Sequence, residues 1–171
     1  PQEPGHARIY VCGPTVYDLP HVGHARCYVI YDVLVRHLRA SGVKVTYCRN
    51  ITDIDDKILN RSKENGEDPT ALSRRFTEAF WEDMRALGNQ SPDVEPKVSD
   101  HLPQIFEIIE TLIQKGAAYA AGGDVYYSVG SFEGYGKLSH RTVDALLEGG
   151  SGRVGEEEAK KKRAPADFAL W

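Results

Sequence analysis

The sequence has few cysteines, no long apolar run and no excess of positive charge, and each absence excludes a class of protein. Three cysteines, Cys12, Cys27 and Cys48, are too few and too scattered for a disulfide framework, and an odd number fits a reducing compartment. No run reaches the roughly 18 apolar residues of a membrane span, and the first residues show no signal segment. We therefore expect a cytoplasmic protein without a membrane contact.

The charge balance limits the kinds of partner. A net charge of −4 argues against a chain that binds nucleic acid by bulk positive charge, although it leaves room for RNA held by a local patch or another domain. The hydrophobic share of 41% and charged share of 27% are those of an ordinary globular protein. A length of 171 residues suffices for one sizeable core with a subdomain. We find no internal repeat and expect a monomer.

The first third of the chain predicts a strand, a turn, a helix and a second strand. Residues 8–12 and 43–48 are rich in β-formers, and the first run stops at a Gly-Pro turn. Apolar residues from Ile30 to Leu38 recur at helical spacing, and Gly42 ends that helix. This order predicts one right-handed, parallel βαβ unit.

The rest of the chain predicts a mixture of helices and strands. Helices are expected to end near residues 66, 88 and 116, the second of them beginning at an Asp-Pro pair typical of a helix start. Further expected elements are a hairpin at 117–129, a short helix near 142–148, a charged flexible linker near 149–164, and a last strand in DFALW, 167–171.

The stretch YVCGPTVYDLPHVGHAR, residues 10–26, carries the strongest functional pattern. A strand that turns into a helix N-terminus places free N–H groups at the carboxyl edge of a sheet, where nucleotides bind in open α/β folds. Gly23 leaves no side chain where a ligand has to come close. His21 and His24 lie one turn apart, and imidazole N–H donors there can stabilise charge on a transferring phosphoryl group.

Two other interpretations of the histidine pair remain open. Zinc pairs on helices more often have i, i+4 spacing with a nearby carboxylate, which is missing here, and the histidines can also serve as a helix cap or core residues. A cluster of His21 with Cys12, Cys27 and Cys48 matches no zinc spacing, so we expect Cys27 and Cys48 to be small buried apolar residues.

Longer motifs carry a resemblance to a known family. GPTVYDLPHVGH resembles the HIGH region of the class I aminoacyl-tRNA synthetases. Together with YVCGPTVYD and NITDIDDKI it is similar specifically to the cysteinyl-tRNA synthetases, and the likeness extends to the closing DFALW. The one departure within the motif is Val22 in place of the usual isoleucine, a small apolar change.

The resemblance implies substrates, a metal and site residues. It implies activation of L-cysteine by ATP, with Mg²⁺, and transfer to tRNA(Cys) by the full-length enzyme. A zinc ion would bind the substrate thiolate and so reject serine. The implied roles are catalytic for His21 and His24; ATP-binding for Pro14, Thr15, Tyr17, His21, Gly23 and His24; cysteine-binding for Cys12, Gly13 and Thr52; and zinc-binding for Cys12, with the other ligands outside this chain.

The resemblance also implies the fold, which is α/β. Residues 1–90 would form the first βαβ part of a Rossmann-type nucleotide-binding domain, 91–164 an inserted α+β subdomain, and 165–171 a strand returning toward a second half. In this family the remaining zinc ligands, the KMSKS loop and the tRNA-reading domains come later in the chain. We therefore expect these residues to belong to a larger enzyme and to be inactive alone.

Some residues have simpler interpretations. In TDIDDK, Thr52 can cap a helix whose first turn favours the acids Asp53, Asp55 and Asp56, or the acids can contact a ligand. Helix-face packing is expected for the aromatic residues Phe76, Phe80 and Trp81, and solvation for the basic run 160–163.

Two functional alternatives remain. A related cysteine ligase of mycothiol synthesis shares the adenylation chemistry, although Lys57 after TDIDD is more typical of the synthetase. The other is a synthetase-derived module that binds nucleotide without catalysis.

Overall fold

The computed structural model describes residues 3–140, 142 and 160–171, and the chain divides into two compact units. The first unit is Pro1–Leu102 and the second is Pro103–Trp171. The helix expected near 142–148 and most of the linker near 149–164 lie outside the described residues.

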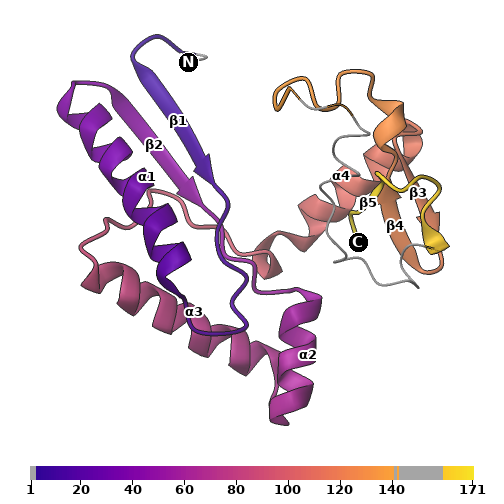
Figure 1. Ribbon diagram of the computed structural model, residues 1–171, viewed down its shortest axis with the longest axis horizontal. Helices are drawn as coiled ribbons and strands as arrows, with labels where there is room; N and C mark the ends of the chain where they lie inside the picture. Colours follow the sequence, from indigo (N-terminus) through magenta and orange to yellow (C-terminus); the bar gives the residue numbers. More distant parts are fainter. Residues whose placement is uncertain (1–2, 141, 143–159) are drawn as a thin grey trace. The chain divides into compact units, whose positions relative to one another are not determined.

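A parallel βαβ unit organises the first unit, and its presence confirms the predicted α/β class. Strands β1 (His6–Val11) and β2 (Lys44–Arg49) pair in parallel, so that Val11 lies opposite Arg49 at their carboxyl ends. Helix α1 (Val22–Ala40) is the crossover between them. Figure 1 shows the two strands side by side with α1 running along them.

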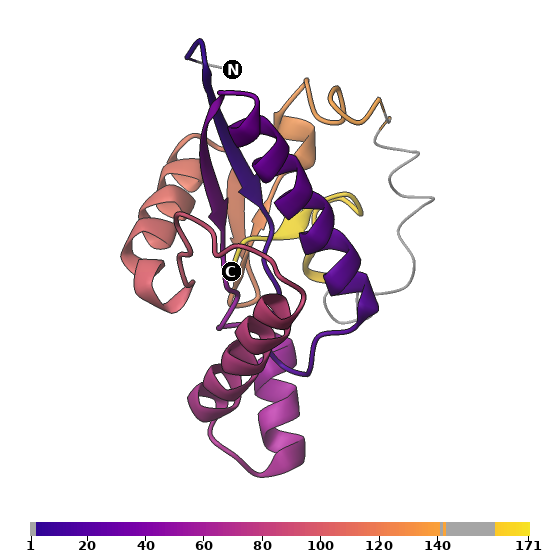
Figure 2. The ribbon, with the colours of Figure 1, turned by 90° about the vertical axis from the view of Figure 1, so that its left-hand side faces the viewer.

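Two further helices follow in this unit, and short-range signals predict the end of the first and the start of the second. Helix α2 (Asp56–Asn65) ends at Gly66, which has a left-handed φ of 65°. Helix α3 (Pro69–Ala86) begins with proline, and the carboxylate of Asp68 accepts a hydrogen bond from the N–H of Ala71 at 2.9 Å. The two helices lie against each other, as Figure 2 shows.

The core of the first unit lies between the sheet, α1 and α3. Burial of apolar side chains in this core removes their surface from water and is the main stabilising contribution to the unit. The largest of them that are almost fully enclosed are Phe80, Ile51, Ile58, Leu72, Val16 and Val35. Phe76 and Trp81 pack against this cluster, which confirms the helix-face packing expected for the three aromatics.

Helix α1 forms as predicted, but the face that it buries is different. It buries Tyr28 and Val35, whereas Ile30 and Val33 remain 56% and 59% exposed. The helix carries apolar residues on two sides, and only one side meets the sheet and α3 in the described residues.

A polar residue anchors the buried face of α1. Asp32 is 8% exposed, and its carboxylate accepts hydrogen bonds from Arg36 Nε at 2.6 Å and from the N–H of Gln90 at 2.9 Å. These bonds satisfy the buried oxygens and tie α1 to the segment that follows α3.

The segment after α3 runs back alongside β2, so the first unit extends beyond the boundary that the sequence predicted. Isolated parallel bridges join Cys48 to Val94 and Ile51 to Lys97. A 3-10 turn at Ser99–His101 closes this segment. Residues 91–102 therefore pack with the first unit, and the boundary differs from the one expected after residue 90.

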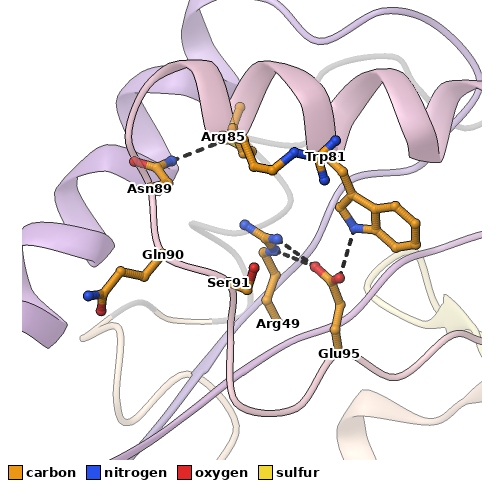
Figure 3. A pocket seen from close by; sticks show the side chains of 8 residues that line it. Arg49, Trp81, Arg85, Asn89, Gln90, Ser91 and Glu95 are labelled. Atoms are coloured by element: carbon orange, nitrogen blue, oxygen red, sulfur yellow. Dashed lines mark hydrogen bonds and ion pairs between the residues drawn. The ribbon is translucent and has the colours of Figure 1, made fainter.

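A buried ion pair joins β2 to the returning segment. Arg49 is 3% exposed, and its Nε donates to Glu95 Oε1 at 2.9 Å. Trp81 Nε1 donates to the other oxygen of Glu95 at 2.8 Å, as Figure 3 shows. The guanidinium also lies over the rings of Phe80 and Tyr28, at 4.8 and 5.1 Å from their centroids. The charge of Arg49 is thus paired with Glu95, and its guanidinium stacks on two aromatic rings.

The second unit is a helix with a small antiparallel sheet. Helix α4 (Leu102–Gln114) leads into the hairpin of β3 (Ala118–Ala121) and β4 (Asp124–Tyr127), which confirms the predicted hairpin. A 3-10 turn, Val129–Ser131, follows. Strand β5 (Phe168–Ala169) pairs with β4.

The pairing of β5 differs from the expectation for residues 165–171. We expected a strand that returns toward a second half of the domain, but in the described residues this strand completes the small sheet. Asp167, immediately before it, is 2% exposed and accepts hydrogen bonds from the Tyr119 hydroxyl and the N–H of Val129, at 2.7 and 3.0 Å. This buried carboxylate therefore fixes the turn that starts β5.

The basic run 160–163 is solvated in part, as expected, because Lys160 and Arg163 are exposed, but it also makes contacts with the small sheet. Lys161 Nζ forms an ion pair with Asp124 at 2.7 Å. The guanidinium of Arg163 lies 4.1 Å from the ring centroid of Tyr119.

Among the described residues, no helix has both the length and the apolar character that a membrane crossing requires.

The buried ion pair of Arg49 generates a stability prediction. Glu95→Gln should lower the free energy of unfolding by about 3 kcal/mol, because it leaves a buried guanidinium without its counter-charge. Urea unfolding followed by circular dichroism measures the change. Glu64→Gln is the matched control, because the Arg61–Glu64 pair is exposed and should contribute about 0.5 kcal/mol or less. Equal effects of the two substitutions would contradict the prediction.

Candidate functional site

The candidate site lies at the carboxyl edge of the parallel pair, where the segments after β1 and β2 stay side by side. Thr15 and Thr52 form a parallel bridge. The N–H of Thr52 donates to the carbonyl of Pro14 at 3.0 Å, and the N–H of Val16 donates to the carbonyl of Thr52 at 3.2 Å. Pairing therefore resumes beyond the ends of the strands, with a short irregular stretch between.

Gly13 lies in that irregular stretch, where the two chains touch. A Cβ on Gly13 would overlap the backbone carbonyl oxygen of Asn50. The N–H of Gly13 donates to Asn50 Oδ1 at 2.7 Å. Only glycine allows this approach, which brings Cys12 next to the end of β2.

The two histidines form the start of α1. His21 is the N-cap residue, and its Nδ1 accepts a hydrogen bond from the N–H of Gly23 at 3.0 Å. The Nδ1 of His24 accepts from the N–H of His21 at 3.1 Å, which completes a capping box. The two rings lie 4.1 Å apart by their centroids.

This geometry fixes the protonation site of each neutral ring. Because both Nδ1 atoms accept from backbone N–H groups, the ring proton of each histidine resides on Nε2. Each imidazole therefore presents one Nε2–H donor away from the backbone. Capping and donation to a ligand use different nitrogens of the same ring, so the two roles do not exclude each other.

The reason for Gly23 differs from the one that the sequence indicated. A Cβ at this position would lie 2.8 Å from Cε1 and 2.9 Å from Nδ1 of His21. The glycine thus makes room for the ring of the capping histidine. In the described structure, this contact is within the protein and requires no ligand.

The environment of His24 favours its neutral form. Burial lowers the pKa of His24 below the usual 6.5, and repulsion from His21 lowers it further. His21 is exposed and also lines an open hollow of about 230 Å³ together with Val22 and Leu87. His24 is accordingly a neutral donor at physiological pH.

Helix α2 holds the loop that carries Tyr17. The ammonium of Lys57 lies 5.5 Å from the ring centroid of Tyr17, and Arg61 forms an ion pair with Asp18 at 2.6 Å. Both cations come from one face of α2, so this helix fixes the loop between the site edge and α1.

The acidic motif TDIDD has structural partners, one of them unexpected. Asp55, and not Thr52, is the N-cap of α2, and its carboxylate accepts from the N–H of Lys57 at 2.8 Å. Asp53 accepts from the N–H and the hydroxyl of Ser99, at 3.0 and 2.5 Å. The expectation that Thr52 caps the helix was wrong, and Thr52 instead faces the segment after β1.

Two residues of the site were missed in the sequence. The hydroxyl of Tyr28, on α1, donates to the carbonyl of Cys12 at 3.1 Å, and Asn50 bonds to Gly13 and to Thr52. The position of Asn50 directly after a strand that ends at the same edge was the available signal. Tyr28 had none, because a tyrosine on an apolar helix face is typical of a core.

Cys12 meets the requirements for one metal ligand. Cys12 is exposed, and among the described residues its thiol makes one weak hydrogen bond, 3.7 Å from its sulfur to the carbonyl oxygen of Gly13. Within residues 3–140, 142 and 160–171, no group of three or more histidine, cysteine or acidic side chains gathers at one point. The described residues therefore fit a zinc site as the donor of one thiolate and not as a complete ligand set. Cys27 and Cys48 are free and half-buried.

Comparisons with known proteins identify relatives of this chain. The family model of the class I (C) tRNA synthetase catalytic domain matches residues 1–171. The cysteine–tRNA ligase of Anaeromyxobacter sp. (strain K) is 59% identical over 172 residues, and that of Cyanothece sp. (strain PCC 7425) is 52% identical over 171 residues. These alignments cover all of this chain but only 35% and 34% of those relatives, so the chain spans about a third of their length.

A solved structure shares the fold. The LeuRS in a ternary complex from Agrobacterium radiobacter K84 aligns with a TM-score of 0.60 at 23% identity. The alignment covers 72% of this chain and 16% of that one. At this identity the likeness concerns the fold alone.

The capping geometry predicts the titration of the histidines. In a ¹⁵N-labelled protein, both neutral rings should show a protonated Nε2 and a bare Nδ1, and His24 should titrate below pH 6.5. Because the pKa of His24 is lowered in the fold, its contribution to stability is full above pH 6.5 and is lost as the pH falls through the folded pKa. An Nδ1-protonated ring at neutral pH would contradict the capping box.

Proposed function

Because this chain belongs to the family of class I (C) tRNA synthetase catalytic domains, we propose that its protein is a cysteine–tRNA ligase. It would activate L-cysteine with ATP, with Mg²⁺, and transfer the cysteinyl group to tRNA(Cys). One observation carries the proposal: two Nε2–H donors at a helix N-terminus share a sheet edge with an exposed cysteine. The relatives with the highest identity quoted above bear this name.

ATP is the ligand that suits the start of α1. The helix N-terminus and the two imidazole donors favour phosphate oxygens. The loop between β1 and α1 supplies the remaining contacts, and α2 fixes its position through Tyr17 and Asp18. The residues that we propose for ATP are Pro14, Thr15, Tyr17, His21, Gly23 and His24.

The histidines act on the first reaction. The carboxylate of cysteine attacks the α-phosphorus of ATP, a new oxygen–phosphorus bond forms, and the bond to pyrophosphate breaks. Negative charge builds on the phosphoryl oxygens, where donors from His21 and His24 stabilise it. As the rings keep their Nδ1 bonds to the backbone, the donors are already oriented before the substrate binds.

The cysteine substrate would bind beside Cys12, Gly13 and Thr52. When bound, zinc would hold the substrate thiolate and so separate cysteine from serine. Cys12 would supply one of its ligands, and the others would come from a part of the protein outside this chain. Thr52 offers a hydroxyl at the same edge. The three free cysteines are consistent with a cytoplasmic location.

The first test of the function is exchange of pyrophosphate into ATP by the full-length enzyme. Exchange should depend on cysteine, and His24→Ala should slow it about 100-fold with a smaller change in cysteine binding, because one donor to the developing charge is lost. His37→Ala, at the exposed far end of the same helix, should leave the rate unchanged. Exchange that does not depend on cysteine would refute the proposed function. An unchanged exchange rate in His24→Ala would show that His24 serves only as part of the helix cap.

A second test concerns Cys12. In the full-length enzyme, Cys12→Ser should weaken zinc retention and cysteine affinity together, because a neutral hydroxyl is a poor zinc ligand. ATP affinity should persist, since the start of α1 does not include Cys12. Zinc content after dialysis and separate titrations of cysteine and ATP measure these effects. Cys27→Ser, on α1, is the control, and equal zinc loss there would contradict the assignment.

A further inference from the structure

One peptide group at the site edge is held by side chains on both sides. The carbonyl of Cys12 and the N–H of Gly13 belong to the same peptide plane. The carbonyl accepts from the Tyr28 hydroxyl at 3.1 Å, and the N–H donates to Asn50 Oδ1 at 2.7 Å. Both polar groups of this plane are therefore satisfied by side chains and not by the sheet.

We propose that Tyr28 and Asn50 are positioning residues of the amino-acid site. By clamping the Cys12–Gly13 peptide from opposite sides, they fix the direction of the Cys12 thiol and of the Thr52 hydroxyl. The proposal rests on the proposed function, because it assigns these residues to the cysteine-binding step of that reaction.

The clamp lies where regular pairing is interrupted. The β1–β2 ladder ends at Val11 and Arg49, and pairing resumes at the bridge of Thr15 and Thr52. Between these points the side-chain bonds replace the ladder. Among the described residues the exposed thiol of Cys12 has only a weak partner, so its position depends on the peptide plane that fixes the Cα of Cys12.

Packing holds the Tyr28 ring in place, and a backbone contact positions Asn50. Tyr28 is 3% exposed, its ring packs edge-on against Phe80 with 5.3 Å between centroids, and Arg49 covers it. On the other side, the backbone of Asn50 lies directly against Gly13.

Asn50 also sets the hydrogen-bonding role of Thr52. Because Oδ1 accepts from Gly13, the amide orientation is fixed and Nδ2 points to Thr52. Nδ2 donates to the Thr52 hydroxyl oxygen at 3.1 Å. The hydroxyl oxygen thus accepts from Asn50, and its own proton is directed elsewhere, where it can be donated to a bound amino acid. One side chain therefore orients two of the three proposed cysteine-binding residues.

Two substitutions test the clamp in the full-length enzyme. Tyr28→Phe removes only the hydroxyl and keeps the buried ring, and Asn50→Ala removes both amide bonds. Each should raise the KM for cysteine about tenfold, which corresponds to the loss of one well-placed hydrogen bond. The KM for ATP should not change, and a chelator should remove zinc faster than from the wild type.

Matched controls make the outcome specific. Tyr31→Phe alters the next turn of α1, where the tyrosine packs on the core, and Asn65→Ala removes an exposed amide at the end of α2. Neither should affect the KM for cysteine or the release of zinc. If Asn50→Ala fails to fold, as judged by its thermal unfolding, Tyr28→Phe carries the test.

The results separate this proposal from the function on which it rests. An unchanged KM for cysteine in folded Tyr28→Phe, or an equal rise in the KM for ATP, would overturn the clamp while leaving the function intact. Absence of cysteine-dependent exchange in the wild type would overturn the function. In that case zinc release, which needs no catalysis, still decides the clamp: unaltered release in both variants would overturn it.

Discussion

The close approach of the two chains at Gly13 and Asn50 is the constraint on which the rest of the site depends. Parallel strands bring their carboxyl ends to one edge, but side chains normally separate the segments that leave them. Here the absence of a Cβ on Gly13 lets the backbone of Asn50 come into contact. The proposed ATP loop and the proposed cysteine-binding residues consequently share one narrow edge, and a reaction between two substrates requires that proximity.

The buried charge of Arg49 supports this edge from inside the first unit. Arg49 immediately precedes Asn50, and its guanidinium is fixed by Glu95 and by the rings of Phe80 and Tyr28. An ion pair buried in this way adds little net stability compared with an apolar substitute, because desolvation offsets much of its attraction. Its main effect is to hold the end of β2 in place. The ring of Tyr28 contacts Arg49 while its hydroxyl holds Cys12, so the end of β2, the core and the turn after β1 form one connected support.

The sequence alone was sufficient to predict the features that depend on residues close together in the chain. The Asp68-Pro69 start, the Gly66 stop and the hairpin follow from local backbone preferences, and all three are present. Tertiary context decided the rest. Thr52 and Asp55 can both cap a helix, and the pairing of Thr52 with the segment after β1 left Asp55 to do so. Helix α1 carries apolar residues on two sides, so periodicity could not identify the buried one. The clamp from Tyr28 and Asn50 joins residues that are far apart in the sequence and ends on backbone groups, which no side-chain pattern reveals.

The histidine pair shows why a structural and a catalytic interpretation of a motif need not compete. Each ring has two nitrogens with opposite roles in the neutral state. The Nδ1 atoms satisfy N–H groups that the first turn of any helix leaves without partners, and this fixes both rings against the backbone. The Nε2–H groups then point away from the backbone, so less side-chain entropy would be lost on binding the phosphate that we propose. Gly23 is required because the ring of His21 has to fold back over it. The spacing of the motif is therefore set by the cap, and the donors that the cap orients are those that the proposed chemistry needs.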